Sequence, residues 1–342
     1  MAESRTISIG EFFNIRNQLP VVDVRAESEY AQGHIPGARN IPLLNDAERK
    51  EVGTLYKQKG QAEAIRAGFR LVGPRLLDMV DLGKAAALHN ELVVHCWRGG
   101  MRSANFSQFV GMAGVNTWVL QGGYKAYRQE AVTLYGRPLP IRLIGGQTGT
   151  GKSEVLRALQ AQGEQILDLE MLASHKGSTF GGLTLPPQPT NESFQNLLFE
   201  ELRKLDPART VWVEDESMSI GHVFIPEQFF RQMSLSPIIE LKLDRAERIR
   251  RLVNEYGVSD PAAFVKAMEK IVKRLGGQNF NAAMDHVLAG NWPAAIDILL
   301  HYYDKAYQMS FVRHQNFKLG EVEWTGQDAH QAAQHLIELA GH

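Results

Sequence analysis

Residues 141–153 read Ile141-Arg142-Leu143-Ile144-Gly145-Gly146-Gln147-Thr148-Gly149-Thr150-Gly151-Lys152-Ser153. The apolar start predicts a buried strand, and the glycine-rich remainder has the spacing Gly-x4-Gly-Lys-Ser/Thr of a P-loop. In a P-loop, backbone amides and the N-terminus of the following helix surround phosphate oxygens, the lysine adds a positive charge, and the hydroxyl can bind Mg²⁺. The expected phosphate-binding residues are Gly146, Thr148, Gly149, Gly151, Lys152 and Ser153, with Ser153 also the expected contact to Mg²⁺.

Further apolar runs follow this loop and alternate with helix-like segments. The runs that predict strands are Gln165–Leu167, Val211–Val213 and Pro237–Leu243. Because this alternation is typical of a parallel sheet covered by helices, we expect a P-loop kinase-like domain over residues 135–258. From about residue 260 the chain reads as wholly helical, and Asp260 can cap a helix that Pro261 begins. Residues 259–342 are therefore expected to form a helical C-terminal region packed on the P-loop domain.

A second set of short apolar runs precedes the P-loop. The runs that predict buried strands are Val21–Val24, Gly33–Gly37, Leu92–His95 and Thr117–Leu120. Helix-like segments such as Ser103–Val110 separate them, so we expect another mostly parallel α/β domain over residues 1–134. Gly136, Pro138 and Pro140 interrupt any regular pattern and indicate a linker beginning near residue 135.

The composition fits two globular domains without a strong charge signature. The chain has 342 residues, 44% hydrophobic and 22% charged, with a formal net charge of −1. Nucleic-acid binding would therefore need a local basic patch. Lys266, Lys270, Lys273 and Arg274 fall on one predicted helix, and either a solvated face or an RNA contact explains them.

The sequence contains no pattern typical of export or of a membrane anchor. The first residues lack an apolar signal segment, and no run of eighteen apolar residues occurs, so we expect a cytoplasmic protein with no membrane partner. The single cysteine, Cys96, cannot form an internal disulfide or a cysteine-based zinc cluster. Its role must lie in packing or in chemistry.

Cys96 opens the run Cys96-Trp97-Arg98-Gly99-Gly100-Met101-Arg102-Ser103, which follows a predicted strand and precedes a predicted helix. A loop at a helix N-terminus directs amides toward one point and favours negative charge there. Arg98 and Arg102 add positive charge, so we expect the pKa of Cys96 to be lowered and its thiolate stabilised. We expect Cys96, Arg98 and Arg102 to be the catalytic residues.

Carboxylates follow two of the predicted strands of the P-loop domain. Glu214-Asp215-Glu216 follows one strand and Asp168 follows another. Any of them could bind a metal ion or act as a base, and the sequence does not choose among them.

A predicted helix after the last predicted strand carries three arginines in its first two turns: Arg245, Arg248 and Arg251. P-loop kinases carry arginines that clamp phosphates at this place. Two interpretations stay open. The three residues form a phosphate or tRNA clamp, or they belong to a charged helix face with pairs such as Glu247 and Arg251.

Four motifs in the first 130 residues resemble those of rhodanese domains, in the same order. They are Asp23-Val24-Arg25, Gly33-His34-Ile35-Pro36-Gly37-Ala38, the Cys96 loop and Gln121-Gly122-Gly123-Tyr124. The resemblance implies a rhodanese-like fold in which Asp23 and Arg25 brace the active-site loop. Compared with common rhodaneses, the loop carries one extra glycine, which gives Cys-x5-Arg spacing and room for a tetrahedral anion.

Over its whole length, the chain is similar to the tRNA 2-selenouridine synthase family. The similarity includes the Cys96 loop, the P-loop, Gly177-Ser178-Thr179-Phe180-Gly181, Gln188-Pro189-Thr190 and Glu214-Asp215-Glu216-Ser217. It implies an α/β protein in which a rhodanese-like domain precedes a P-loop NTPase-like domain with a helical C-terminal region.

The same resemblance implies a function. A transferase would replace sulfur by selenium in the wobble-position 2-thiouridine of tRNA, with selenophosphate as donor and an S-geranyl intermediate made from geranyl diphosphate. Cys96 would be the nucleophile that carries selenium or attacks the activated ring, Arg98 and Arg102 would stabilise anions, and Trp97 would stack on the base. No tightly bound cofactor is expected, although Mg²⁺ could bind through Ser153, and the P-loop ligand could be ATP or geranyl diphosphate.

Two alternatives remain at this stage. The protein could be an ATP-dependent tRNA sulfurtransferase in which Cys96 carries a persulfide. It could also be a small-molecule kinase with a regulatory rhodanese module, in which case Cys96 would be replaceable.

Overall fold

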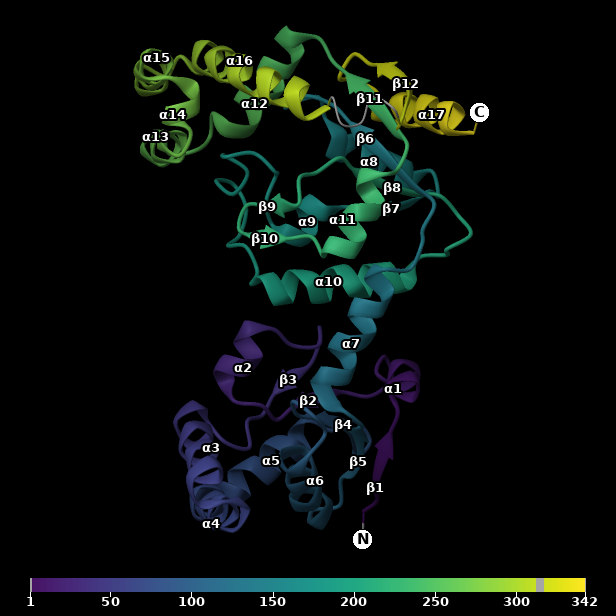
Figure 1. The fold of residues 1–342 in the computed structure, drawn as a ribbon, viewed down its shortest axis with the longest axis vertical. Helices are drawn as coiled ribbons and strands as arrows, with labels where there is room; N and C mark the ends of the chain where they lie inside the picture. Colours follow the sequence, from purple (N-terminus) through teal and green to yellow (C-terminus); the bar gives the residue numbers. More distant parts are fainter. Residues whose placement is uncertain (1, 312–316, 342) are drawn as a thin grey trace. The chain divides into compact units, whose positions relative to one another are not determined.

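The computed structural model describes residues 2–311 and 317–341, which form two compact units spanning residues 1–134 and 135–342 (Figure 1). Each unit contains its own five-stranded sheet. Within the described ranges, no helix combines the length and the apolar composition that crossing a bilayer requires.

The first unit is built on a parallel sheet with the strand order β1-β5-β4-β2-β3. Its strands are β1 (Ser4–Ile7), β2 (Val21–Asp23), β3 (Arg39–Asn40), β4 (Glu91–His95) and β5 (Asn116–Leu120). Its helices are α1 (Ile9–Ile15), α2 (Glu27–Gln32), α3 (Asp46–Lys59), α4 (Gln61–Val72), the short 3-10 helix η1 (Gly73–Arg75), α5 (Leu76–Ala86), α6 (Met101–Met112) and α7 (Gly123–Tyr135). Central strands β2 and β4 are almost entirely buried, as expected for parallel strands covered on both faces.

The expected strand at Gly33–Gly37 is absent, and a turn occupies this segment. Pro36 has no amide hydrogen to donate to a sheet, and Gly37 has φ +84°, a left-handed value that ends an extended segment. The chain pairs with β2 only afterwards, through the two residues of β3.

The second unit has a parallel sheet with the order β12-β11-β6-β8-β7 and a separate small antiparallel hairpin, β9-β10. Its strands are β6 (Ile141–Gly145), β7 (Gln165–Leu167), β8 (Val211–Glu214), β9 (Ser219–Ile220), β10 (Val223–Phe224), β11 (Ile238–Lys242) and β12 (Lys318–Glu323). Its helices are α8 (Lys152–Ala161), α9 (Leu169–Ala173), α10 (Asn191–Lys204), α11 (Glu227–Ser234), α12 (Arg245–Tyr256), α13 (Pro261–Glu269), α14 (Val272–Leu275), α15 (Gly277–Leu288), α16 (Trp292–Phe311) and α17 (Ala329–Ala340).

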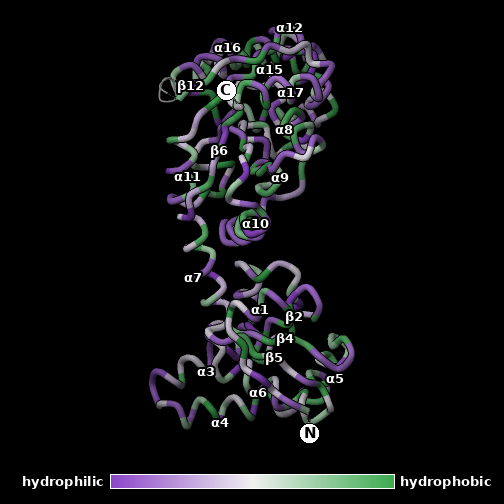
Figure 2. Tube along the Cα trace, turned by 90° about the vertical axis from the view of Figure 1, so that its right-hand side faces the viewer, coloured by the Kyte–Doolittle hydropathy of each residue, from purple (hydrophilic) through white to green (hydrophobic). Residues whose placement is uncertain are grey.

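Two apolar cores hold this unit together. One joins the sheet to α8 and α17 and includes Leu156, Trp212 and Leu336. The other gathers α12 to α16 around Phe264. Figure 2 shows the apolar residues of the sheet strands in green, enclosed by helices of mixed hydropathy.

The C-terminal region is not wholly helical as expected, because β12 joins the sheet beside β11. Only Val322 of this strand is buried, so its sequence lacks the apolar run that predicts a strand. The backbone pairs with β11, Val322 packs in the core, and ion pairs to the neighbouring strand link Lys318 with Glu240 (2.7 Å) and Lys242 with Glu321 (2.5 Å). Residues 312–316 and 342 of the expected helical region lie outside the described residues.

The helix that Asp260 caps is shorter than expected. Asp260 does accept hydrogen bonds from the amides of Ala262 and Ala263, with Pro261 at the first helical position. However, α13 ends at Glu269, and the chain starts again as α14 at Val272. Lys266 and Lys273 therefore lie on different helices, so the expected basic face on one helix does not form.

Candidate functional site: a cysteine loop and a P-loop

Cys96 follows directly after β4, at the carboxyl edge of the first sheet, and its side chain is 3% exposed. Its Sγ accepts a hydrogen bond from the Gly100 amide (3.3 Å) and lies 3.3 Å from the Ser103 hydroxyl. Burial raises the pKa of the thiol, but the Ser103 hydroxyl, backbone amides of the loop and the charge of Arg102 together hold the pKa below its ordinary value. The loop therefore stabilises a thiolate.

Close backbone contacts fix the shape of this loop. A Cβ at Gly99, which has φ +64°, would lie 2.5 Å from the carbonyl oxygen of Leu120, and a Cβ at Gly123 would lie 2.3 Å from that of Cys96. The Tyr124 amide donates to the Cys96 carbonyl (2.8 Å). Glycine is thus required at both positions, because two loops meet backbone to backbone.

Asp23 and Arg25 lie behind the loop and are fully buried. Arg25 donates to both carboxylate oxygens of Asp23 (2.7 to 3.0 Å) and to the carbonyl of Gly33 (2.7 Å). Its guanidinium lies 3.9 Å from the ring centroid of Tyr124, the residue whose amide holds Cys96. This arrangement agrees with a bracing role for the pair.

The other expected residues of the loop differ in their surroundings. Arg102 binds Glu29 of α2 through two hydrogen bonds (2.5 and 3.3 Å), which orient its guanidinium. Arg98 is exposed. Trp97 is 37% exposed, and its ring is tilted against Tyr124 with centroids 5.7 Å apart, so part of the indole remains available for stacking.

The P-loop connects β6 to α8 in the second unit, as the motif predicts. Its glycines are needed where the chain is crowded: a Cβ at Gly146 would lie 2.7 Å from Thr150 Oγ1, and one at Gly151 would lie 2.6 Å from the Trp324 ring. Lys152 Nζ donates to the Gly146 carbonyl (3.0 Å), so the lysine is held across the loop.

Three carboxylates gather beside the P-loop, with oxygens of Glu170, Glu214 and Glu216 within 4.8 Å of one another. Ser153 donates to Glu170 (2.9 Å). Glu214 is fully buried, and neither of its oxygens has a hydrogen-bond partner among the described residues. Burial, followed by the charge of Glu170, raises the pKa of Glu214 well above its ordinary value and that of Glu216 to about 8. A divalent cation with oxygen ligands fits this group, because it would neutralise the crowded negative charge.

The remaining acidic candidates are placed differently. Asp168 accepts a hydrogen bond from the Met171 amide (2.8 Å) and thereby caps α9. It lines the same cavity as Asp215, which follows β8 directly.

The three arginines of α12 that the sequence singled out separate into two groups. Arg245 pairs with Asp297 (2.8 Å) and Asp304 (3.1 Å) of α16, and the buried Arg248 also pairs with Asp304. Arg248 also donates to the Thr148 carbonyl (2.9 Å), so it supports the P-loop from behind. Carboxylates of α16 hold both Arg245 and Arg248, and neither residue lines the cavity that the P-loop borders, so neither acts as a phosphate clamp. Arg251 does line it, together with Arg250.

The P-loop, Glu170 and Glu216 of the acidic group, and Arg251 line one cavity of about 850 Å³. Its wall also has an apolar part, made by Met171, Leu185, Leu252, Tyr256, Tyr303 and Tyr307. A ligand in this cavity would meet phosphate-binding groups at one side and apolar surface at another.

Sequence reasoning missed three residues of these sites: Glu29, Ser103 and Glu170. Glu170 could have been found, because it closely follows β7 at the carboxyl edge of a parallel sheet, where ligands bind. Glu29 is distant in sequence from the arginine that it binds, and no local pattern predicts that contact.

A thiolate-stabilising cysteine loop on one parallel sheet and a P-loop on a second define a rhodanese-like domain joined to a P-loop NTPase-like domain. Residues 11–130 match the rhodanese-like domain, and residues 139–335 match the tRNA 2-selenouridine synthase AAA domain. The chain belongs to the tRNA 2-selenouridine synthase family.

Two relatives carry that name. The protein of Nitrosomonas europaea is 34% identical over 267 residues, which cover 75% of this chain and 68% of the relative. The protein of Shewanella sediminis is 33% identical over 333 residues, covering 87% and 89% respectively. Among solved structures, TT1252 from Thermus thermophilus is 18% identical and has a TM-score of 0.31, covering 60% of this chain and 98% of its own.

Proposed function

We propose that this protein replaces the sulfur of wobble-position 2-thiouridine in tRNA by selenium, with selenophosphate as the donor and Cys96 as the nucleophile. The observation that carries the proposal is the environment of Cys96 Sγ, which the Gly100 amide and the Ser103 hydroxyl both contact at 3.3 Å. A thiolate held by a loop with Cys-x5-Arg spacing suits chemistry beside a tetrahedral anion. Family membership supplies the substrate class.

The P-loop cavity would hold geranyl diphosphate, which alkylates the sulfur of 2-thiouridine and releases diphosphate. Backbone amides, Lys152 and Arg251 suit the diphosphate, and the apolar wall with its three tyrosines suits a ten-carbon chain. Ser153, Glu170, Glu214 and Glu216 would hold Mg²⁺. When bound, the ion neutralises charge on the diphosphate.

In the second half of the reaction, the Cys96 thiolate would attack C2 of the S-geranylated ring, and geranyl thiolate would leave. The selenium atom of selenophosphate then attacks C2 and displaces Cys96, after which water cleaves the P–Se bond to give phosphate. Selenium keeps its oxidation state throughout. We favour this path over a perselenide on Cys96, because forming a perselenide from selenophosphate would require an oxidant.

Mass spectrometry of nucleosides from thiolated tRNA tests the proposal. With thiolated tRNA in excess over the protein, incubation with both co-substrates should give 2-selenouridine. Omission of selenophosphate should leave the S-geranyl nucleoside, apart from the one equivalent bound to Cys96, and omission of geranyl diphosphate should leave 2-thiouridine. Selenouridine formation that depends on added ATP rather than on geranyl diphosphate would contradict the assignment of the P-loop ligand. Absence of selenium under every condition would overturn the proposed function.

A further inference from the structure

A second hollow, of about 480 Å³, lies on the rhodanese-like unit along α3. Residues of α3 form most of its wall, and Leu44 and Arg102 complete it. We call it the α3 hollow. Its α3 residues are Arg49, Lys50, Val52, Gly53, Thr54, Tyr56 and Lys57.

The charged groups of the α3 hollow all have the same sign. Arg49, Lys50, Lys57 and Arg102 line it, and no carboxylate does. Arg49 and Arg102 share the carboxylate of Glu29, whereas neither Lys50 nor Lys57 forms an ion pair with any residue that the structure describes. Glu29 thus offsets part of the charge, and Lys50 and Lys57 leave the α3 hollow with a net positive charge.

Helix α3 buries none of its side chains, although it is 14 residues long. Figure 2 shows it as a mainly hydrophilic segment. Val52 packs partly against the core of the unit, and the remaining mostly polar surface of α3 borders solvent or a polar partner. The ring of Tyr56 is 57% exposed within the hollow and offers a flat surface on which a base could stack.

The α3 hollow is connected to the reactive cysteine through Arg102. This arginine lies in the first turn of α6, beside the loop of Cys96, and its charge acts on the Cys96 thiolate. The same side chain lines the α3 hollow. The start of α4 also approaches the loop, because Gln61 Nε2 lies 4.0 Å from Met101 Sδ.

The cations extend over a distance that suits a polymer. Arg49 and Lys57 are eight positions apart on one helix, which corresponds to about 12 Å along its axis. A single tetrahedral anion is too small to contact both ends, whereas successive phosphates of a nucleic-acid strand can do so. Phosphate contacts from lysine and arginine position a nucleic acid without reading its sequence.

We infer that the α3 hollow binds the phosphate backbone of the RNA substrate next to the nucleotide that enters the Cys96 loop. This inference rests on the proposed function, because it takes tRNA as the substrate. Arg102 then borders both the bound backbone and the reacting base, and Tyr56 packs against a neighbouring nucleotide.

The full-length protein with Lys50→Gln and Lys57→Gln tests the inference. Affinity for 2-thiouridine tRNA, measured by filter binding or anisotropy at several salt concentrations, should fall about tenfold. The slope of log K against log salt should become shallower by about 1.4 to 1.8, because two phosphate contacts are lost. The rate of Cys96 alkylation by iodoacetamide should not change, which shows that the catalytic loop is intact.

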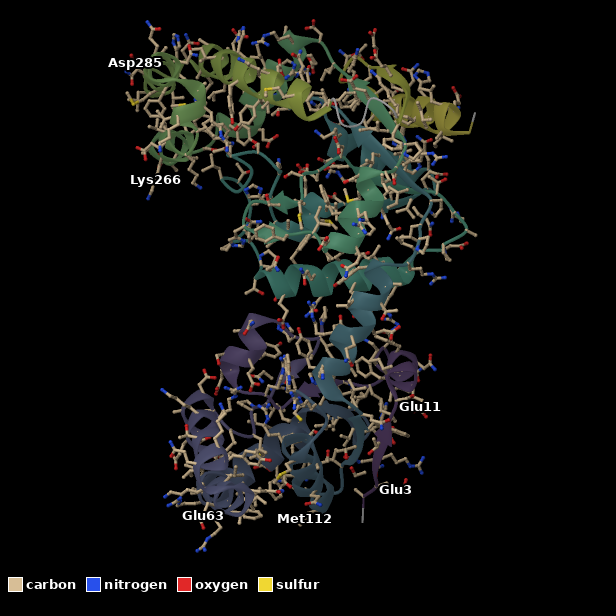
Figure 3. All side chains as sticks on the ribbon, in the orientation of Figure 1. Glu3, Glu11, Glu63, Met112, Lys266 and Asp285 are labelled. Carbon is tan, nitrogen blue, oxygen red and sulfur yellow. The ribbon has the colours of Figure 1, made fainter. Side chains whose placement is uncertain are left out.

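The matched control carries Lys59→Gln and Arg66→Gln, which change two cations of the same helical hairpin outside the hollow. Arg66 pairs with Glu63 (4.0 Å), the residue labelled on α4 in Figure 3. The control should keep the affinity and salt slope of the wild type.

Two outcomes would overturn the inference while leaving the proposed function in place. The first is an unchanged tRNA affinity of the Lys50/Lys57 variant in a protein whose wild type makes selenouridine. The second is an unchanged tRNA affinity with a raised KM for selenophosphate, which would assign the hollow to a small anion. A wild-type protein that binds no tRNA would overturn both the inference and the proposed function.

Discussion

The thiolate of Cys96 depends on Ser103 more than on the nearby arginines, since the Ser103 hydroxyl gives the largest contribution that lowers the pKa. Ser103→Ala should raise the pKa of Cys96. At pH 7 the alkylation rate with iodoacetamide should then fall about 2- to 10-fold, as expected for one lost hydrogen bond. Ser107→Ala is the matched control, because Ser107 is buried on the same helix without a bond to the sulfur. An equal effect of both variants would contradict this role of Ser103.

Glu216 makes the stability of the second unit depend on pH. Its pKa rises from 4.5 to about 8 in the folded protein, so between these values the folded state holds a proton that the unfolded chain has released. Rising pH therefore lowers the free energy of unfolding across this window. In EDTA, the Tm should decrease from pH 5 to pH 8, and Mg²⁺ should reduce the decrease.

Glu216→Gln should make this pH dependence weaker, and Glu201→Gln on the surface of α10 should leave it as in the wild type. A Tm that rises with pH in EDTA would contradict the raised pKa of Glu216. Glu214 contributes in the same direction, because its pKa is also raised.

At the residue scale, the sequence predicted those parts of the sites that are encoded locally. The spacing of the P-loop motif predicted that Lys152 and Ser153 lie at the start of a helix beside the loop. The run that Cys96 opens predicted that Arg102 lies near the cysteine. It did not predict that Arg102 is held by Glu29, 73 positions away. The Glu170–Glu216 contact was missed for the same reason, since it joins the ends of two separate strands.

At the element scale, α12 supports the P-loop through Arg248, which is 2% exposed. Arg248→Met leaves the Thr148 carbonyl without this donor, and Asp304 keeps only Arg245 as its partner. Removing one partner of a buried ion pair typically costs about 3–5 kcal/mol, and the remaining pair with Arg245 places this variant at or below the lower end of that range. Urea unfolding of the second unit should therefore move to lower concentration. Lys204→Met, at an exposed position near the end of α10, should change the free energy of unfolding by no more than about 0.5 kcal/mol. Similar midpoints for the two variants would contradict the supporting role of Arg248.

Most of the strands that the sequence predicted are buried on both faces, such as β4 and β8, because such burial requires a continuous apolar run. The partly buried edge strand β7 was also predicted. The edge strand β12 was missed, since Val322 is its single buried apolar residue and charged side chains such as Lys318 and Glu321 occupy most of the rest. The prediction of a strand at Gly33–Gly37 was wrong because it gave too little weight to Pro36 and Gly37, which form a turn. Local composition thus indicates central strands well and edges poorly.

At the scale of the whole molecule, each unit carries one reactive centre, and the two chemistries differ. The second unit has a P-loop, an acidic group and an apolar wall, which suit transfer of a prenyl group from a diphosphate. The first unit has a thiolate and a basic hollow, which suit exchange at an RNA base. If this division is correct, a variant that inactivates one unit should accumulate a different nucleoside from a variant that inactivates the other.

The most direct test of this account is therefore nucleoside mass spectrometry with Cys96→Ala and Lys152→Ala, each given thiolated tRNA, geranyl diphosphate and selenophosphate. Lys152→Ala should leave 2-thiouridine unmodified, because the P-loop no longer binds the diphosphate. Cys96→Ala should accumulate the S-geranyl nucleoside without selenouridine. Lys125→Ala, a change on the exposed side of α7, should give selenouridine as the wild type does. Selenouridine made by Cys96→Ala at the wild-type rate would contradict the central claim that Cys96 is the nucleophile of selenium exchange.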